Sequence, residues 1–255
     1  MPSNPATPPR PIAVIPSRYA STRFPGKPLV SIAGKLMVQH VHLRCVESGA
    51  FARVIVATDD ERIASAVRLF GGEAMLTSAS CATGTDRVAE VARSLANAPD
   101  DQVFVNVQGD EPAIHPEALS LLARAFDDPA VGMATLVRPL ADDERANPNV
   151  VKALVGQDGF ALYFSRADVP YLRNPSPTLR RFGHLGIYGY RRKTLLRLSA
   201  LPPTPLEQAE SLEQLRALEN GIRIACRTTA HRSVGVDRPE DVPAAAALLR
   251  EFKLA

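Results

Sequence analysis

The feature that most constrains the fold is a regular alternation of short apolar runs with amphipathic segments in the first half of the chain. Apolar, β-branched runs of this kind predict buried strands, and the spacing between them is helical. The expected strands are IAVIP (12–16), RVIVATD (53–59), EAMLT (73–77) and QVFVNVQGDEP (102–112), the last running into an acidic turn. The expected helices cover 36–49, 60–72, 83–96 and 115–126. This alternation predicts an α/β fold whose mainly parallel sheet is flanked by helices.

The second half is less regular and predicts a mixed sheet. Its expected strands are VGMATLVRPL (131–140), VVKALV (150–155), ALYFSR (161–166) and IRIACRTTA (222–230). The stretch 170–183, rich in proline and arginine, is expected to be a long connection, and 184–198 a strand that runs into a helix. Capped helices are expected at 210–221 and 237–252, the second with Asp237 as its N-cap.

Length and composition predict one continuous domain. A chain of 255 residues without internal repeats is long enough to bury a sizeable core. We expect residues 1–10 to form a disordered, proline-rich tail and residues 11–255 to form the domain, with a dimerisation arm inserted in its mixed-sheet part. Such an arm would be an insertion in the domain and not a second one.

Charge and cysteine usage exclude several classes of protein. A net charge of +3, with acidic residues mixed among the basic ones, does not predict nucleic-acid binding. Cys45, Cys81 and Cys226 lie far apart, which favours reduced thiols over a disulfide framework or a zinc site. With neither a secretory signal nor an apolar run of about 18 residues, we expect a cytoplasmic protein without a membrane span.

Three cations follow the first expected strand. Arg18, Arg23 and Lys27 lie in a loop that Pro25, Gly26 and Pro28 make rigid. The loop matches neither a dinucleotide-binding nor a P-loop pattern. Arginine forks and a lysine point charge suit a triphosphate, and ligands bind beyond the carboxyl ends of parallel strands. Phosphate binding is therefore favoured over the alternative, a solvated basic loop.

Two carboxylates could hold a metal ion. Asp110 ends the strand that carries Gln108, and Asp237 follows the apolar pair Val234 and Val236. Mg²⁺ prefers one or two carboxylates together with substrate phosphates. The alternative for each residue is a helix cap, so the metal site depends on whether the two meet opposite the basic loop.

The remaining candidates are weaker when taken one at a time. Thr83, Gly84 and Thr85 begin a helix and could present hydroxyl and N–H groups to a base or anion, although a simple N-cap explains them nearly as well. Only His184, beside Tyr188, has a histidine setting typical of a substrate pocket. Because no Ser-His-Asp or Cys-His arrangement is present, covalent catalysis is not expected.

Taken together, these segments resemble one enzyme family. The segments are IPSRYASTRFPGKPL, VIVATDDERI, TGTDR, VNVQGDEP, NPNVVKAL, ALYFSRADVPY, HLGIYGYR, ESLEQLRALENG and GVDRPEDV. In this order, from about residue 12 to about residue 249, they resemble the 3-deoxy-manno-octulosonate (KDO) cytidylyltransferases, or CMP-KDO synthetases. The first segment is typical of sugar-acid cytidylyltransferases in general, and HLGIYGYR with the LEQLR helix is typical of the KDO branch.

The resemblance implies a nucleotide-diphospho-sugar-transferase fold, a homodimer, and Mg²⁺ at the active site. It implies transfer of CMP from CTP to the anomeric hydroxyl of KDO, with release of pyrophosphate, for lipopolysaccharide synthesis. Two alternatives stay open: a cytidylyltransferase for another acid sugar, such as a sialic acid or amino-KDO, and a nucleotide-binding module without turnover.

Site residues are carried over by position in these segments. Arg18 and Lys27 would act on the CTP phosphates, with Arg23 nearby, and Asp110 and Asp237 would bind the metal. The nucleotide and sugar sites would be lined by Thr83, Gly84, Thr85, Arg87 and Gln108. The sugar acid would be faced by His184, Tyr188, Glu213 and Gln214, with Arg166 as the partner of its carboxylate.

Two parts of the chain depart from the family pattern. Cys81 stands where the family has a histidine, and TGTDR replaces SGTER, so no side-chain role is carried over to Cys81 or Asp86. The stretch from Arg173 to Arg181 is short and divergent, and no sugar or dimer contact is carried over to it.

Overall fold

The structure, a computed structural model, describes residues 9–20, 23–174, 176, 178–252 and 254. Its main sheet has the strand order β11-β7-β10-β6-β1-β4-β5, with β8 and β9 attached beside β10. The strands are β1 (Ile12–Ser17), β4 (Arg53–Thr58), β5 (Glu73–Leu76), β6 (Val103–Asn106), β7 (Met133–Pro139), β8 (Lys152–Val155), β9 (Ala161–Ser165), β10 (Phe182–Arg191) and β11 (Ile224–Thr228). A separate antiparallel pair consists of β2 (Ser31–Ile32) and β3 (Lys35–Leu36).

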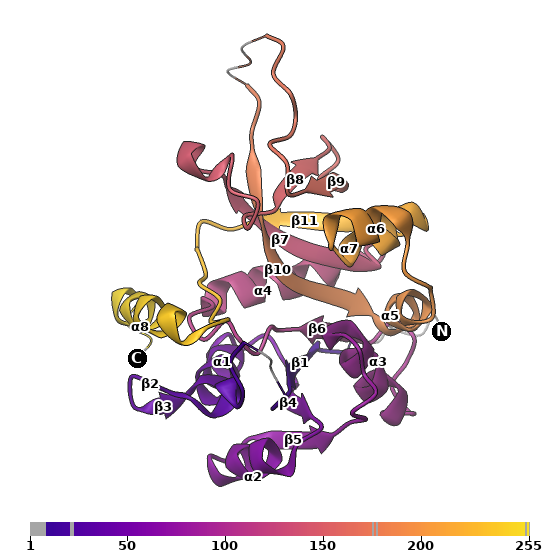
Figure 1. Cartoon of the computed structure of the whole chain (residues 1–255). Helices are drawn as coiled ribbons and strands as arrows, with labels where there is room; N and C mark the ends of the chain where they lie inside the picture. The colour runs from indigo at the N-terminus through magenta and orange to yellow at the C-terminus, as the bar shows by residue number, and fades with distance from the viewer. Residues whose placement is uncertain (1–8, 21–22, 175, 177, 253, 255) are drawn as a thin grey trace.

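The two halves of the sheet differ as the sequence predicted. Strands β6, β1, β4 and β5 are parallel, and β11 is parallel to β7. Strand β10 is antiparallel to both β6 and β7 and so joins the two halves. Figure 1 shows the parallel strands in the lower part of the molecule and β7, β10 and β11 above them. The α/β fold with a mostly parallel sheet is confirmed.

Helices cover both faces of the sheet, which explains the continuous apolar runs of its central strands. In β1, Ala13 and Ile15 belong to one core and Ile12 and Val14 to the other. The first core is closed by α1 (Met37–Glu47), α2 (Glu61–Leu69) and α4 (Pro116–Arg124). The second is closed by α3 (Gly84–Ser94), α5 (Arg192–Ser199) and α7 (Gln214–Glu219). No helix in the described ranges combines the length and apolarity needed to cross a bilayer.

The expected helices are present, with ends set by their caps. The Asp60 carboxylate accepts from the amide of Arg62, and the Thr83 hydroxyl accepts from the amide of Asp86 at 3.1 Å. The helix predicted for 210–221 is present but shorter, as α7 over Gln214–Glu219, and it is preceded by α6 (Pro205–Glu210), which was not predicted. Ser211 between them has a φ of 51°, a left-handed conformation that ends α6.

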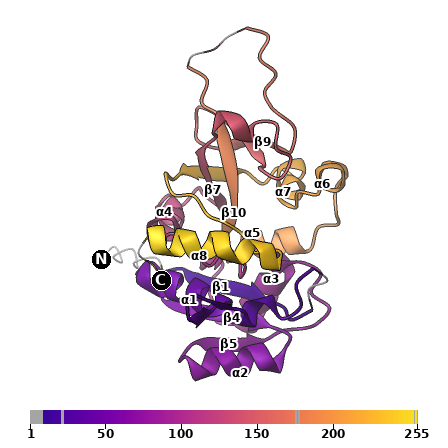
Figure 2. The ribbon, with the colours of Figure 1, turned by 60° about the vertical axis from the view of Figure 1, so that its left-hand side comes forward.

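The end of the chain requires another correction. The last helix, α8 (Val242–Glu251), follows a short 3-10 helix, η4 (Pro239–Asp241). Asp237 is not its N-cap, because the carboxylate of Asp241 instead accepts from the amides of Asp237 and Arg238. Helix α8 packs against Ile32 and Met37, next to α1, and Figure 2 shows it crossing in front of the parallel strands. The Asp237 side chain is therefore free for another role.

Two peripheral segments were also predicted. Residues 1–8 of the proline-rich tail lie outside the described residues, whereas the Arg10 guanidinium donates to the carbonyl of Phe51 at 3.1 Å. The connection from β9 to β10 projects away from the sheet in both views (Figures 1 and 2). Its Tyr171 side chain is 88% exposed. The described part of this projecting connection, residues 166–174, 176 and 178–181, is called the arm below.

Candidate active site

The loop after β1 is folded back on itself by its glycine. Gly26 has a φ of 70°, and its amide donates to the carbonyl of Tyr19 at 3.0 Å. A Cβ at Gly26 would lie 3.2 Å from the Tyr19 ring, so a larger residue is disfavoured by space as well as by conformation. Lys27 then begins the 3-10 helix η1 (Lys27–Leu29), with its side chain only 15% exposed.

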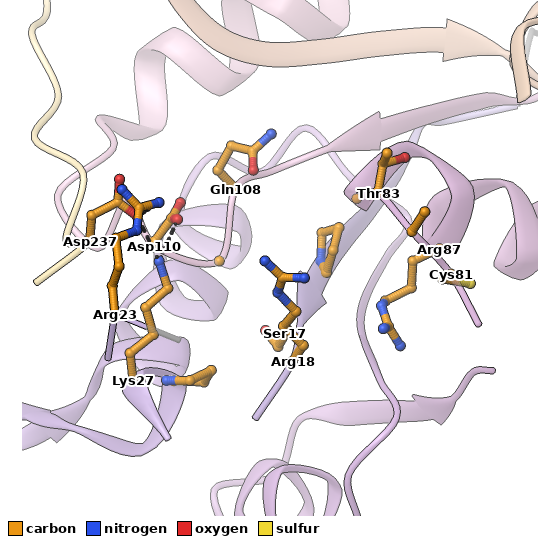
Figure 3. A pocket seen from close by; sticks show the side chains of 15 residues that line it. Ser17, Arg18, Arg23, Lys27, Cys81, Thr83, Arg87, Gln108, Asp110 and Asp237 are labelled. Atoms are coloured by element: carbon orange, nitrogen blue, oxygen red, sulfur yellow. Dashed lines mark hydrogen bonds and ion pairs between the residues drawn. The ribbon is translucent and has the colours of Figure 1, made fainter. Parts of the chain in front are cut away.

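Lys27 joins the two predicted metal ligands. Its ammonium lies 2.7 Å from Asp110 Oδ2 and 3.2 Å from Asp237 Oδ1, and it also donates to the carbonyl of Val236 at 3.1 Å. Arg23 lies 3.5 Å from the same oxygen of Asp237. Figure 3 shows these four side chains pointing toward one another. The condition that the sequence left open is met: the carboxylates meet beside the basic loop.

The backbone fixes this meeting point. The amide of Val236 donates to the carbonyl of Asp110 at 2.8 Å, which ties the C-terminal connection to the end of β6. Gly109 allows the approach from the other side, because a Cβ there would lie 2.6 Å from the carbonyl oxygen of Pro16. The ends of β1 and β6 can therefore pack closely only with glycine at this position.

The donor set fits a divalent cation. Asp110 Oδ2 and Asp237 Oδ1 converge on one ammonium nitrogen, so both already point at a common positive charge. Carboxylate oxygens are the ligands that Mg²⁺ prefers, with substrate phosphates completing the coordination. These two residues would hold such an ion, with Lys27 as the neighbouring positive charge.

A cavity of about 290 Å³ opens beside this cluster. Figure 3 shows Lys27, Asp110 and Asp237 on one side of it, Thr83, Cys81 and Arg87 on the other, and Arg18 between them. Its lining comprises Pro16, Ser17, Arg18, Arg23, Lys27, Pro28, Cys81, Ala82, Thr83, Gly84, Arg87, Gln108, Gly109, Asp110 and Asp237. The start of α3 and the three cations make this first cavity attractive to anions.

Two residues of the TGTDR segment, Thr85 and Arg87, form hydrogen bonds with other residues of the protein. Arg87 lines the first cavity, but its guanidinium already donates to Asp59 at 3.1 Å and to the hydroxyl of Thr77. Thr85 is buried, lines neither cavity described here, and bonds with Glu213. Both therefore help to hold the start of α3 in place, and a direct contact of Thr85 with a ligand stays a prediction.

A second cavity, of about 450 Å³, adjoins the first. It shares Gln108, Asp110 and Asp237 with the first cavity. Its other lining residues are Glu111, Arg138, Asn149, Val150, Val151, His184, Leu185, Gly186, Tyr188, Leu212, Glu213, Gln214, Ser233 and Gly235. The carboxylate pair thus stands where two ligands could meet.

Strand β10 supplies one wall of the second cavity through an irregularity. Its register against β7 shifts between Leu185 and Tyr188, a bulge of the kind that re-aims side chains near active sites. The side-chain amide of Gln108 donates to the carbonyl of Gly186 at 3.0 Å. The bulge is thereby fastened to the residue that both cavities share.

His184 is held as a neutral imidazole. Burial lowers its pKa to about 3. The hydroxyl of Thr135 lies 2.9 Å from His184 Nε2 and 2.8 Å from the carbonyl of Ile187. Because that hydroxyl donates to a carbonyl, its oxygen accepts from Nε2–H. This leaves His184 Nδ1 as an acceptor, suited to a ligand hydroxyl.

The other predicted sugar-side residues also line the second cavity. Burial raises the pKa values of Tyr188 and Glu213, and the Tyr188 ring lies 5.4 Å from that of His184. The Nε2 atom of Gln214 is buried without a hydrogen-bond partner. A buried polar atom of this kind is costly unless a ligand or water pairs with it.

Arg166 is placed differently from the expectation. Its guanidinium donates to the carbonyls of Pro148 and Glu210, at 3.0 and 2.8 Å, and it lines neither cavity described here. Among the described residues, the arginine that lines the second cavity is Arg138, paired with Glu144 at 2.7 and 2.5 Å. Arg138 was not predicted from the sequence, although it lies at the end of β7, one residue before Pro139, because a single arginine at a strand end does not identify its partner.

Two further lining residues were missed. Ser17 ends β1, and its buried hydroxyl has no hydrogen-bond partner while facing the first cavity. Glu111 lines the second cavity, and burial raises its pKa to about 7. The acidic turn contained Glu111, yet a single sequence does not distinguish the carboxylate that binds a cation from the one that is buried beside it.

Comparisons with known proteins agree with this arrangement. A cytidylyltransferase family model matches residues 12–224. The 3-deoxy-manno-octulosonate cytidylyltransferase of Myxococcus xanthus is 58% identical over 241 residues, covering 94% of this chain and 97% of the relative. That of Porphyromonas gingivalis is 47% identical over 248 residues, covering 94% and 96%.

Solved structures give the same result. A CMP:2-keto-3-deoxy-manno-octonic acid synthetase complexed with CTP matches with a TM-score of 0.89 and 43% identity, covering 95% of this chain and 99% of that one. A 4-diphosphocytidyl-2C-methyl-D-erythritol synthase, at 16% identity and a TM-score of 0.64, shares the fold alone. The chain therefore belongs to the cytidylyltransferase family and, within it, to the 3-deoxy-manno-octulosonate cytidylyltransferases.

Proposed function

We propose that this chain transfers CMP from CTP to the anomeric hydroxyl of KDO and releases pyrophosphate, a step of lipopolysaccharide biosynthesis in the cytoplasm. The observation that carries the proposal is the carboxylate pair, Asp110 and Asp237, which lines two adjoining cavities of different character. The first cavity is lined by the three cations of the loop after β1, which suit a triphosphate, and the second adds hydrogen-bonding side chains such as His184, Tyr188 and Gln214, which suit a polyol.

The first cavity is assigned to CTP. Arg18, Arg23 and Lys27 would neutralise the triphosphate, and the amides at the start of α3 would add N–H donors beside Thr83 and Gly84. Phosphoryl transfer depends mainly on positioning and charge stabilisation, so these residues would be the main catalytic contribution of the protein. Lys27, now shared between two carboxylates, would become available to phosphate as a cation replaces it.

The second cavity is assigned to KDO. His184 Nδ1 would accept from a sugar hydroxyl, Gln214 Nε2 would donate to one, and Tyr188 and Glu213 would line the same surface. Arg138 would pair with the sugar carboxylate. Gln108, which lines both cavities, would lie between the reacting groups.

In the reaction, the anomeric oxygen forms a bond to the α-phosphorus while the bond from that phosphorus to pyrophosphate breaks in line, and the proton of the hydroxyl passes to water. Asp110 and Asp237 would hold Mg²⁺, which when bound stabilises phosphate charge and lowers the pKa of a nearby hydroxyl. The protein itself would orient the two substrates and neutralise the leaving group.

A homodimer is part of the proposal. Its support is the arm, which leaves Tyr171, Leu172 and Leu179 exposed at 88%, 38% and 37%. Apolar side chains gathered on a projecting segment are typical of a protein–protein contact. Sedimentation equilibrium would give the mass in solution, and a monomer at working concentrations would contradict this part.

The test is pyrophosphate release with Mg²⁺, each of the four nucleoside triphosphates, and KDO, amino-KDO or a sialic acid as acceptor. Release with CTP and KDO is expected. Release with CTP and another acid would keep the mechanism and move the sugar assignment. CTP binding without any release would instead favour a nucleotide-binding module.

A further inference from the structure

Outside the two cavities, two histidines and a glutamate gather where three segments meet. His115 is the N-cap residue of α4 and Glu117 lies in its first turn. His231 lies in the connection between β11 and η4, and Phe252 follows the end of α8. One ligand atom from each of His115, Glu117 and His231 lies within 4.8 Å of the other two. The three are called the His-Glu-His cluster below.

The side chains of the cluster contact one another through a hydrogen bond and through stacked rings. His231 Nε2 lies 2.9 Å from Glu117 Oε2. The imidazole rings of His115 and His231 stack with centroids 3.6 Å apart and planes 2° from parallel. His115 Nδ1 also accepts from the amide of Glu117 at 3.3 Å as the N-cap of α4, which leaves its Nε2 for a ligand, and because the stacked rings are parallel one of them would turn for both to point at one ion.

The electrostatics favour the forms of these groups that bind metals. The pKa of His115 is lowered by burial and by the neighbouring His231, while the hydrogen bond from His231 lowers the pKa of the Glu117 carboxyl. A metal needs a neutral imidazole and an ionised carboxylate.

The surroundings resemble the shell around a metal site. The Phe252 ring stands edge-on to both imidazoles, with centroids 5.3 Å from His115 and 6.1 Å from His231. It covers one side of the cluster with an apolar surface, which limits access of water. The Glu117 side chain is 78% exposed on the other side, so an ion could enter from solvent.

We propose that His115, Glu117 and His231 bind a divalent transition cation of the Zn²⁺ type, with water completing its coordination. Two imidazoles and one carboxylate form a donor set that Zn²⁺ accepts and that Mg²⁺, which prefers oxygen, does not. The cation would replace the proton between His231 and Glu117. The site is thus chemically distinct from the carboxylate pair of the active site.

A cation bound to the His-Glu-His cluster would link the two connections that carry Asp110 and Asp237. His115 and Asp110 lie on the connection from β6 to α4, and His231 and Asp237 lie on the connection from β11 to η4. A cation bound to the cluster would tie these two connections together a second time, in addition to the hydrogen bond from Val236 to Asp110. The site itself does not depend on the proposed function, since its ligands line neither cavity.

The experiment is a Co²⁺ titration of the full, tag-free chain in excess Mg²⁺, followed by visible absorption, with Zn²⁺ added afterwards as competitor. One equivalent of Co²⁺ is expected to give a d–d band that Zn²⁺ abolishes. In His231→Gln and Glu117→Gln the apparent affinity should fall at least about 100-fold, because even partners outside the ligand set change affinity by about 10–100-fold.

The matched control is Glu251→Gln, which removes an exposed carboxylate paired with Arg232, the residue after His231, without touching the cluster. It should bind Co²⁺ like the parent. Glu117 is exposed, so its substitution should leave the melting temperature in chelator unchanged, which separates ligand loss from misfolding. Absence of the band in the parent, or equal binding by parent, His231→Gln and Glu117→Gln, would overturn the proposal.

Discussion

The two cavities differ in how they carry charge. The first gathers Arg18, Arg23 and Lys27 around the carboxylates of Asp110 and Asp237, whereas the second adds buried hydrogen-bonding groups such as His184, whose imidazole is held neutral by burial. The first is assembled from loops that follow β1 and β6, and the second from the bulged antiparallel strand β10 and the short helix α7. Parallel strand ends therefore supply fixed charge, and the mixed part of the sheet supplies shape and directed hydrogen bonds.

Substitution of Asp110, one of the two carboxylates that line both cavities, should have the largest effect on the rate of the reaction. We expect Asp110→Asn to lower kcat by about 10³-fold while changing the KM for CTP much less, because it weakens the cation site without removing the phosphate-binding cations. Steady-state kinetics with pyrophosphate detection measures both constants. Asp158→Asn, in an exposed pair with Arg223, is the control. Near-normal turnover of Asp110→Asn would remove Asp110 from the metal site.

Substitutions of Arg138 and Arg166 test which arginine contacts the sugar carboxylate. Arg138→Leu should raise the KM for KDO by about 10–100-fold, the value of one or two hydrogen bonds to a charged group, and leave the KM for CTP unchanged. Arg166→Leu should leave both KM values near normal and lower stability, because it deprives the carbonyls of Pro148 and Glu210 of their donor. A raised KM for KDO in Arg166→Leu, with a normal value in Arg138→Leu, would assign the sugar carboxylate to Arg166 instead.

The lowered pKa of His184 predicts that the free energy of unfolding depends on pH. His184 has a folded-state pKa of about 3, below the ordinary value of 6.5, so between these values the unfolded chain binds more protons. The free energy of unfolding should therefore fall as pH falls from about 6.5, by up to about 1.4 kcal/mol per pH unit from this residue alone. Urea unfolding at several pH values would measure it.

The matching variant is His184→Gln, which keeps a hydrogen-bonding side chain and removes the titration. Between pH 6.5 and pH 5 the free energy of unfolding of this variant should fall by about 2 kcal/mol less than that of the parent. Parallel stability curves for the two proteins would mean that His184 is not held neutral in the folded state.

Much of the fold was predictable, because strands buried on both faces and capped helices leave local patterns. The runs at 12–16 and 53–59 became β1 and β4, and Asp60 and Thr83 became the caps of α2 and α3. The short helix α6 and the late start of α7 at Gln214 were not predicted, because the left-handed conformation of Ser211 after α6 leaves no mark in a helical sequence pattern.

The sequence by itself determined the charged half of the site, because a rigid loop and an acidic turn at strand ends place their side chains locally. Only the tertiary structure decided what the distant residues do. Asp237 could equally have been a helix cap until the Asp241 carboxylate took that role and the hydrogen bond from Val236 brought Asp237 beside Asp110. Arg138 and Arg166 are alike in sequence, and their surroundings separate them, because burial and partners depend on residues far away in the chain.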